Sequence, residues 1–361
     1  MTNVIGLFPL TGNGGIASWT KKFLANFPDE EFQIIPVNLT PGIRYGTENL
    51  YQRTVSGLKT LYNTLKELKE VIKKEQPKIL HTTSSGSIGA YRDLRVAQLC
   101  KKHGIKTILH CHYGRITEDI TSKSPIGFLL RKSISLYDQI WVLDQRSYNT
   151  LKAIPQYADK VYLTPNPIDI KYPVDLTPKN YKRVGFIGNL IPSKGIFELV
   201  EACANCNVKL DIIGDGEPSV IEHIKRIGKD KIGKDILLHG KVPNEDAVKL
   251  MSNIDILALP TYYPWEAFPI SILEAMSLSK MVISCNWAAV PDMLKTTDGK
   301  LCGLLVKQKS VSNIIDALKW CQTHPHEADI MRADAYKKVS TTYELSIVYD
   351  IYRNLYRNLP S

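Results

Sequence analysis

The stretch that organises this chain is Trp265-Glu266-Ala267-Phe268-Pro269-Ile270-Ser271-Ile272-Leu273-Glu274-Ala275-Met276. Its two glutamates stand eight positions apart, across a predicted junction between a loop and a helix. Pro269 suits the first helical position, where a missing N–H costs nothing. The N-terminus of a helix favours an anion, so a phosphate could lie between two carboxylates that accept hydrogen bonds from hydroxyl groups. The stretch therefore predicts a nucleotide-sugar site.

Short apolar runs alternate with helical patterns on both sides of this stretch. The predicted strands are Val4–Leu10, Phe32–Val37, Ile79–Thr83, Thr107–Cys111, Gln139–Leu143, Arg183–Gly188, Val208–Gly214, Ile236–Gly240, Ile256–Leu259 and Met281–Cys285. The predicted helices include Ile16–Asn26, Leu58–Lys74, Tyr91–His103 and Ser346–Leu359. Alternation of this kind is typical of α/β domains with a parallel sheet covered by helices on both faces.

The pattern restarts after a segment rich in Pro, Asn and Asp, Tyr162 to Lys182, which we interpret as a linker. We therefore expect two doubly wound, Rossmann-like domains that face each other across a cleft, at residues 1–165 and 166–345. A C-terminal helix within 346–361 could cross back to the first domain. Packing on its own domain is an equally good interpretation of its periodicity.

Composition limits the class of protein. A chain of 361 residues, 44% hydrophobic and 23% charged, is typical of a globular protein with two domains. No apolar run reaches the roughly 18 residues of a membrane-spanning helix, and Met1–Leu10 lacks the basic and small residues of a signal peptide. Seven cysteines without a framework spacing favour a reducing compartment. The net charge of +10 calls for an anionic partner, but the absence of nucleic-acid-binding motifs argues against nucleic acid.

Two glycine-rich loops follow predicted strands. Thr11-Gly12-Asn13-Gly14-Gly15-Ile16 could bring backbone N–H groups close to an anion, although Ala17 breaks the GxGxxG pattern and a simple tight turn is the alternative. In the second half, Gly185 to Gly195 places Lys194 at the mouth of a helix. An ammonium group there could neutralise a diphosphate leaving group, whereas the alternative is a solvated surface lysine.

A histidine pair ends another predicted strand, in His110-Cys111-His112-Tyr113-Gly114. At most one of the two should point into the loop region, and a structural histidine is the commoner explanation for either alone. We expect no metal and no cofactor, because the chain has no HExxH and no DxD sequence. The nearest approach to a DxD sequence is the pair Asp211 and Asp215, which are not adjacent. A GxSxG nucleophile elbow is also absent.

Taken in order, these residues resemble the retaining nucleotide-sugar glycosyltransferases of the GT4 type, which have the GT-B fold. Glu266 and Glu274 match the E-x7-E motif of that family, Gly185 to Gly195 resembles its diphosphate loop, and Ile213-Gly214-Asp215-Gly216 resembles its second glycine turn. Leu238-His239-Gly240-Lys241-Val242 is similar to the segment that holds the base. Gly14-Gly15 and His112 match the glycine loop and histidine of the first domain.

The chain departs from the family pattern at four places. Asn189 stands where an arginine is usual, which leaves Lys194 as the one cation of that motif. Ala267 and Ser279 replace glycines, and Asp292 replaces a glutamate. Loss of the arginine could weaken stabilisation of the leaving group, and Arg115 is a candidate for compensation because it is near His112 in sequence.

The resemblance implies a role for each of these residues. Glu274 would accept hydrogen bonds from the ribose, Glu266 with the amides of Ala267 and Phe268 would hold the transferred sugar, and Lys194 with Gly14 and Gly15 would stabilise the diphosphate. His112 would lie near the reacting centre. Asn189, Gly214, Lys241 and Val242 complete the predicted donor site, and Arg44, Tyr45 and Arg115 are acceptor-side candidates.

The expected function is therefore a metal-independent hexosyltransferase that uses a nucleotide-diphosphate sugar, with a UDP-sugar favoured. The acceptor would be a lipid-diphosphate-linked saccharide in bacterial capsule, exopolysaccharide or O-antigen synthesis. Apolar and basic residues in Lys123–Lys132, with the lysine run at Lys66, Lys69, Lys73, Lys74 and Lys78, predict peripheral attachment to the inner, anionic face of the cell membrane from the cytoplasm. A half-buried helix with a solvated charged face is the alternative interpretation of these residues.

Three alternatives stay open. A cytosolic transferase with a small soluble acceptor would share every donor residue. A sugar-nucleotide epimerase could share the fold but would consume the donor without an acceptor. A two-domain periplasmic sugar-binding protein would need a signal peptide and would have no use for the diphosphate lysine.

Overall fold

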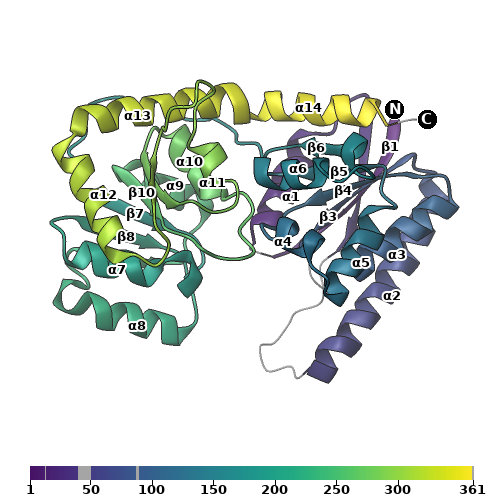
Figure 1. Cartoon of the computed structure of the whole chain (residues 1–361), viewed down its shortest axis with the longest axis horizontal. Coiled ribbons are helices and arrows are strands. Elements are labelled where there is room, and N and C mark those ends of the chain that lie inside the picture. The colour runs from purple at the N-terminus through teal and green to yellow at the C-terminus, as the bar shows by residue number, and fades with distance from the viewer. Residues whose placement is uncertain (13, 40–49, 87–88, 360–361) are drawn as a thin grey trace. The chain divides into compact units, whose positions relative to one another are not determined.

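The computed structural model describes residues 1–12, 14–39, 50–86 and 89–359. The chain forms two compact units, one of Met1–Pro165 with Tyr349–Ser361 and one of Asn166–Val348. Each unit is a six-stranded parallel sheet flanked by helices (Figure 1). None of the helices in these ranges combines the length and apolarity that a bilayer-crossing segment requires.

The first sheet has the strand order β2-β1-β3-β4-β5-β6. Its strands are β1 (Thr2–Phe8), β2 (Phe32–Asn38), β3 (Ile79–Ser84), β4 (Lys106–Cys111), β5 (Gln139–Val142) and β6 (Val161–Leu163). Its helices are α1 (Gly15–Asn26), α2 (Leu50–Glu75), α3 (Gly89–Lys102), α4 (Ile116–Thr121), α5 (Pro125–Ile134) and α6 (Gln145–Lys152). The chain leaves β1 first toward β2 and later toward β3, so the strand order reverses between β1 and β3.

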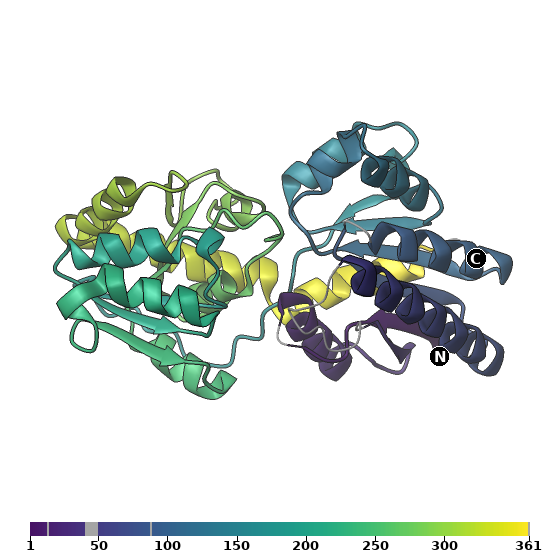
Figure 2. The ribbon, with the colours of Figure 1, turned by 90° about the horizontal axis from the view of Figure 1, so that it is seen from below.

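Alternate residues of these strands face two different layers of helices. On one face, Leu80 of β3 packs with Leu68 of α2 and with Val96 and Leu99 of α3. Both ribbon views show α2 and α3 side by side on this face (Figures 1 and 2). On the other face, His81 of β3 belongs to an aromatic layer with α1 and the C-terminal helix α14 (Leu345–Arg357).

The C-terminal helix is tied to the first unit by polar and aromatic contacts. The hydroxyl of Tyr356 lies 2.7 Å from Nδ1 of His81, and the amide of Gln139 donates to the Leu355 carbonyl at 2.8 Å. On the surface, Arg353 forms an ion pair with Asp29 at 2.6 Å. The last part of the chain therefore belongs to the first unit.

The second sheet has the strand order β12-β11-β10-β7-β8-β9. Its strands are β7 (Arg183–Ile187), β8 (Lys209–Ile213), β9 (Ile236–Gly240), β10 (Ile256–Leu259), β11 (Met281–Cys285) and β12 (Leu304–Val306). Its helices are α7 (Ile196–Ala204), α8 (Pro218–Gly228), α9 (Asn244–Ser252), α10 (Ile270–Ser277), α11 (Val290–Met293), α12 (Val311–Thr323) and α13 (Pro325–Lys338). The strand order reverses between β7 and β10, which pair in parallel. Ligands of such sheets gather at this reversal, beyond the carboxyl ends of the strands.

The strand predictions are close to the structure, with two omissions and one error. The edge strands β6 and β12 were not predicted; each has only three residues. Because β6 includes Tyr162 and Leu163, the interpretation of Tyr162 to Lys182 as a linker is wrong at its beginning. The helix α2 also begins at Leu50, eight residues before the predicted Leu58.

Candidate active site

The loops after β7 and β10 flank the reversal of strand order in the second unit, and they carry the predicted residues Lys194 and Glu266. Lys194 ends a short 3-10 turn, Pro192–Lys194, just before α7. Glu266 lies three residues before Pro269, which precedes the first helical residue Ile270 as the cap of α10. The predicted start of the helix is thus one residue early, which does not move either glutamate off its element.

Lys194 and Glu266 form an ion pair. Nζ of Lys194 lies 3.1 Å from Oε2 of Glu266, and the two side chains are only 16% and 13% exposed. The pair holds a cation and a carboxylate side by side at the reversal of strand order. An arriving diphosphate could attract the ammonium group, and Glu266 would then be available to accept hydrogen bonds from a polyol.

Backbone contacts fix the two loops against each other. The Tyr262 N–H donates to the Ser193 carbonyl at 2.8 Å, and its hydroxyl donates to Glu198 at 3.0 Å. Burial, with a smaller effect of Glu198, raises the pKa of Tyr262 to about 12, so the hydroxyl stays protonated. Gly195, with φ +75°, allows close approach, because a Cβ there would lie 2.3 Å from the Pro260 carbonyl oxygen.

The loop after β11 supports the Glu266 loop from another direction. The Trp287 indole donates to the Tyr263 carbonyl at 2.8 Å, and the Ala289 N–H donates to the Ala267 carbonyl at 3.1 Å. Ala267 and Phe268 are buried. The loop that carries Glu266 is therefore held by hydrogen bonds to the loops after β7 and β11, and not by the start of α10 alone.

Glu274 lies on the second turn of α10 and is partly buried. The helix ends with Ser279 in the left-handed region at φ +52°. The N–H groups of Ser279 and Lys280 donate to the carbonyls of Met276 and Ala275, the arrangement of a Schellman cap. A left-handed cap position favours glycine, which explains the family preference; here the buried Arg332 donates to the Ser279 carbonyl and hydroxyl, both at 3.2 Å.

The glycine turn after β8 lies directly against the loop after β7. Gly214 has φ +146°, and a Cβ there would lie 1.9 Å from the Gly188 carbonyl oxygen. The Gly214 N–H donates to the Gly240 carbonyl at 2.9 Å, and the Leu190 N–H donates to the backbone carbonyl of Asp215 at 2.8 Å. Only glycine permits this packing at position 214. Glycines therefore stand at the carboxyl ends of β7, β8 and β9, namely Gly188, Gly214 and Gly240.

The segment predicted to hold the base follows β9. Nε2 of His239 lies 2.8 Å from Oδ1 of the buried Asp211, whose other oxygen lies 3.1 Å from Arg183. Asp211 is thereby committed to protein partners, whereas Asp215 is exposed. Lys241 is exposed and Val242 is half-buried. In the described part of the chain, no three His, Cys, Asp or Glu side chains gather as potential metal ligands.

Asn189, where the family has arginine, is exposed in the loop after β7. Its carbonyl accepts a hydrogen bond from the Ile191 N–H at 2.9 Å. The side chain could therefore be replaced by a longer one without displacing a buried neighbour.

The remaining predicted residues belong to the first unit. Gly14 caps α1 and Gly15 begins it, and a Cβ on either would meet no heavy atom within 4 Å. His112 is 7% exposed, and its Nε2 is buried without a hydrogen-bond partner among the described residues. Burial lowers the pKa of His112 to about 3, so the imidazole is neutral. Arg115 caps α4, half-exposed, 3.8 Å from Asp119. Arg44 and Tyr45 lie outside the described residues.

Sequence reasoning missed several residues that shape these loops. Tyr262, Glu198, Trp287 and Arg332 act through contacts between residues 24 to 69 positions apart in the chain, which no local pattern reveals. Asp211 did give a signal, since a carboxylate stood within an apolar strand.

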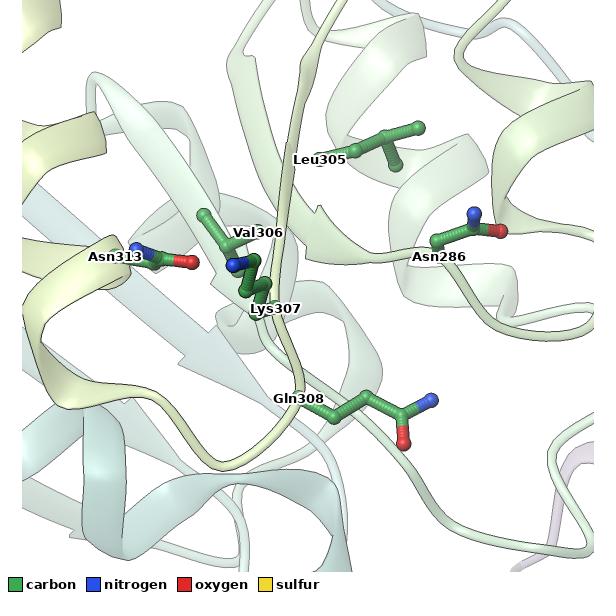
Figure 3. A pocket seen from close by; sticks show the side chains of 6 residues that line it. All are labelled: Asn286, Leu305, Val306, Lys307, Gln308 and Asn313. Carbon is green, nitrogen blue, oxygen red and sulfur yellow. The ribbon is translucent and has the colours of Figure 1, made fainter.

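A cavity of about 510 Å³ also lies at the carboxyl ends of β11 and β12 (Figure 3). The polar side chains that line it are Asn286, Lys307, Gln308 and Asn313, from the loops after the two strands and the start of α12. It contains none of the residues predicted from the sequence.

Comparison with known proteins identifies a family and a fold that this chain resembles. Residues 169–338 match the family model described as "Glycosyl transferases group 1". The chain is 24% identical over 308 residues to the phosphatidylinositol N-acetylglucosaminyltransferase GPI3 subunit of Saccharomyces cerevisiae. The matched region covers 81% of this chain. It spans 64% of that subunit, less than two thirds of its length. The chain is 28% identical over 143 residues to the putative teichuronic acid biosynthesis glycosyltransferase TuaC of Bacillus subtilis, or 39% of this chain and 33% of TuaC.

Among solved structures, HepE of Anabaena in complex with UDP-glucose superposes with a TM-score of 0.72 at 16% identity. The superposition covers 99% of this chain and 100% of HepE. This similarity establishes the fold, and the predicted GT-B class with two doubly wound parallel sheets is confirmed.

Proposed function

We propose, because residues 169–338 match the group 1 glycosyl transferases, that the chain is a retaining glycosyltransferase with a nucleotide-diphosphate sugar as donor. The observation that carries the proposal is the largely buried ion pair of Lys194 and Glu266 at the reversal of strand order. A lysine that faces a diphosphate and a carboxylate that faces a sugar are the two groups such a reaction needs there.

On the donor side, Lys194 neutralises the charge that develops on the diphosphate as it leaves. Glu266, with the amides of Ala267 and Phe268, binds the hydroxyls of the transferred sugar, and Glu274 binds the ribose. The bare backbone at Gly214 lets the nucleotide approach the strand ends, and Lys241 and Val242 contact the base. The sugar is a hexose or an N-acetylhexosamine, and the favoured base is uracil.

The first unit contributes neutral groups to the proposed reaction. Gly14 and Gly15 have no steric neighbour that requires glycine, which suits the approach of a phosphate to their N–H groups. The Nε2 atom of the neutral His112 has no hydrogen-bond partner among the described residues, so it suits a hydrogen bond with a sugar hydroxyl. A protonated imidazole would favour an anionic partner, so the low pKa of His112 favours a neutral sugar hydroxyl as its partner.

Retention of configuration follows from attack of the acceptor hydroxyl on the same face as the leaving group. The new bond joins the acceptor oxygen to the anomeric carbon while the bond to the diphosphate breaks. A departing phosphate oxygen then takes the acceptor's proton, so no side chain is required as the base.

The acceptor in this proposal is a lipid-linked saccharide of bacterial capsule, exopolysaccharide or O-antigen synthesis, reached from the cytoplasmic face of the membrane. The similarity to a phosphatidylinositol glycosyltransferase subunit and to TuaC supports this class. Helix α5 supports it too, because Ile126 and Phe128 are 38% and 63% exposed beside Lys123 and Lys132. A soluble acceptor is the main alternative, and an epimerase the lesser one.

A thermal-shift screen of the purified chain tests the donor half of the proposal. UDP-sugars, GDP-mannose, UDP and GDP should be compared with AMP at equal concentration. One nucleotide diphosphate and its sugars should raise the melting temperature, because a ligand that binds only the folded state stabilises it. If none of them raises it above the AMP control, the proposed donor class is wrong. Donor consumption without any acceptor would favour the epimerase.

A further inference from the structure

A second cavity lies between helices α2 and α3 of the first unit, with a volume of about 580 Å³. Four cationic side chains line it: Lys69 of α2, and Arg95, Lys101 and Lys102 of α3. Its apolar lining comes from Leu65, Leu99 and Leu136, the last of which follows α5. The cavity thus combines concentrated positive charge with an apolar floor.

The positive charge is not neutralised by the protein. Among the described residues, no carboxylate lies within 4.0 Å of any of the four cations, which are all exposed. The adjacent Arg92, by contrast, lies 2.6 Å from Asp93. The carbonyls at the C-terminus of α3 favour Lys101 and Lys102, but they do not account for Lys69 or Arg95. Four like charges around one cavity repel each other, so an anion would stabilise the arrangement.

The cavity is remote from the proposed reaction. Helix α3 begins beyond the carboxyl end of β3. It runs for 14 residues, or roughly 20 Å, back toward the end of the sheet where the strands begin. Lys101 and Lys102 are its last two residues. His112 and Gly14 follow the carboxyl ends of their strands, so an anion in this cavity is not the reacting diphosphate.

We propose that this cavity binds the phosphate headgroup of an anionic phospholipid and thereby seats the first unit on the membrane surface. The cations bind the phosphate, and the leucines contact the glycerol and the first methylenes of the acyl chains. The inference rests on the proposed membrane-linked acceptor, and it adds a defined site to that proposal.

Two observations favour a lipid over other anions. A free phosphate gains no stabilisation from an apolar floor. Among the residues that the structure describes, no aromatic side chain lines the cavity, so it offers no stacking surface to a nucleic-acid base. In addition, α5 packs along α3 and exposes Ile126 and Phe128. The same helical layer therefore offers both a headgroup site and apolar side chains that can enter the interface.

Vesicle co-sedimentation of the whole chain tests the inference. Phosphatidylcholine vesicles should be compared with vesicles that also contain phosphatidylglycerol. In the first variant, Lys69, Arg95, Lys101 and Lys102 are changed to Gln. A matched control changes four exposed lysines of the second unit to Gln, namely Lys225, Lys234, Lys319 and Lys337.

The wild-type chain should bind the anionic vesicles and not the neutral ones. The cavity variant should lose at least about a hundredfold in affinity, since each basic residue at such a surface contributes about fivefold. The control should lose less than about fivefold. A variant that keeps the charge, with Lys101 and Lys102 changed to Arg, should bind like the wild type.

Equal losses in the cavity variant and the control would show that only net charge matters and would overturn the site. Saturable calorimetric binding of inorganic phosphate that the cavity variant abolishes would overturn the lipid as occupant. The cavity variant should also keep the thermal shift with nucleotide diphosphate. Absence of that shift in the wild type would instead refute the proposed transferase, and the vesicle result would stand separately.

Discussion

Nζ of Lys194 lies 3.1 Å from Oε2 of Glu266, although the two residues are 72 positions apart in the chain. Their loops follow β7 and β10, the neighbouring strands at which the order of the second sheet reverses. Both side chains are largely buried, so the pair is little screened by solvent. In the proposed function, these two groups bind the opposite ends of the bond that is broken.

Replacement of either residue by Ala should reduce turnover about 10²–10³-fold, because each removes a charged partner of the transition state. The assay should measure consumption of the nucleotide sugar that the thermal-shift screen identifies. Glu198→Ala is the matched control, since Glu198 lies on α7 and accepts a hydrogen bond from Tyr262 of the loop after β10, but has no assigned contact with the donor. Near-normal turnover in Lys194→Ala or Glu266→Ala, with the fold intact, would refute the assignment.

Asn189→Arg should tighten binding of a nucleoside diphosphate about tenfold, since a charge-assisted hydrogen bond contributes roughly 1.5–3 kcal/mol. The substitution is feasible because Asn189 is exposed. Calorimetric titration of the variant, with Asn189→Gln as the neutral control, measures the change. Equal affinity of the two variants for the nucleoside diphosphate would mean that a side chain at position 189 does not reach the phosphates.

Gly214→Ala should destabilise the second unit by at least about 3 kcal/mol, since the new Cβ would overlap the Gly188 carbonyl and the backbone would be strained. Gly233→Ala separates the two effects, because Gly233 has φ +79° but no neighbour within 4 Å. Strain alone should cost that control about 1–2 kcal/mol. Urea denaturation measures both, and similar losses would contradict the close approach of the two turns.

Acid should destabilise the first unit through its buried histidines. Burial lowers the pKa of His112 to about 3 and holds the pKa values of His81 and His110 well below the ordinary 6.5. The unfolded chain therefore binds more protons, and stability falls as the pH drops below about 6.5. Each histidine contributes a slope of at most about 1.4 kcal/mol per pH unit.

Urea denaturation between pH 7 and pH 5 measures this slope. His112→Asn should reduce it, because one of the three titrating groups is removed. Exposed His326 provides the control, since His326→Asn should leave the slope unchanged. If the slope of His112→Asn equals that of the wild type, the imidazole of His112 is not held neutral by the fold.

The fold could be predicted from the sequence because its signals are local. Ten strands stand out as apolar runs between helical patterns, and Gly214 and Lys194 could be placed at strand ends. The edge strands β6 and β12 could not, since three residues give no periodicity. Pro269 was assigned to the helix from its fixed φ, but it takes an extended ψ of 110° and caps the helix instead.

The contacts within the site could not be predicted, because they depend on the order of the strands. The doubly wound pattern implies that β10 returns to pair with β7, but no local pattern shows that the loops after these strands bring Glu266 within 3.1 Å of Lys194. The support of Ser279 by Arg332, 53 residues away, is similarly invisible. The proposed roles of His112, Gly14 and Gly15 still rest on their match to the family and on their environment within the first unit.

Calorimetric titration of UDP and GDP into the wild type, Lys194→Ala and Lys319→Ala tests the central claim most directly. The account predicts saturable binding of one of the two nucleotides to the wild type. Lys194→Ala should bind it at least about tenfold more weakly, as expected for loss of a charge-assisted hydrogen bond, and the exposed-lysine control Lys319→Ala should bind it like the wild type. Failure of both nucleotides to bind, or equal affinity in Lys194→Ala and the wild type, would contradict it.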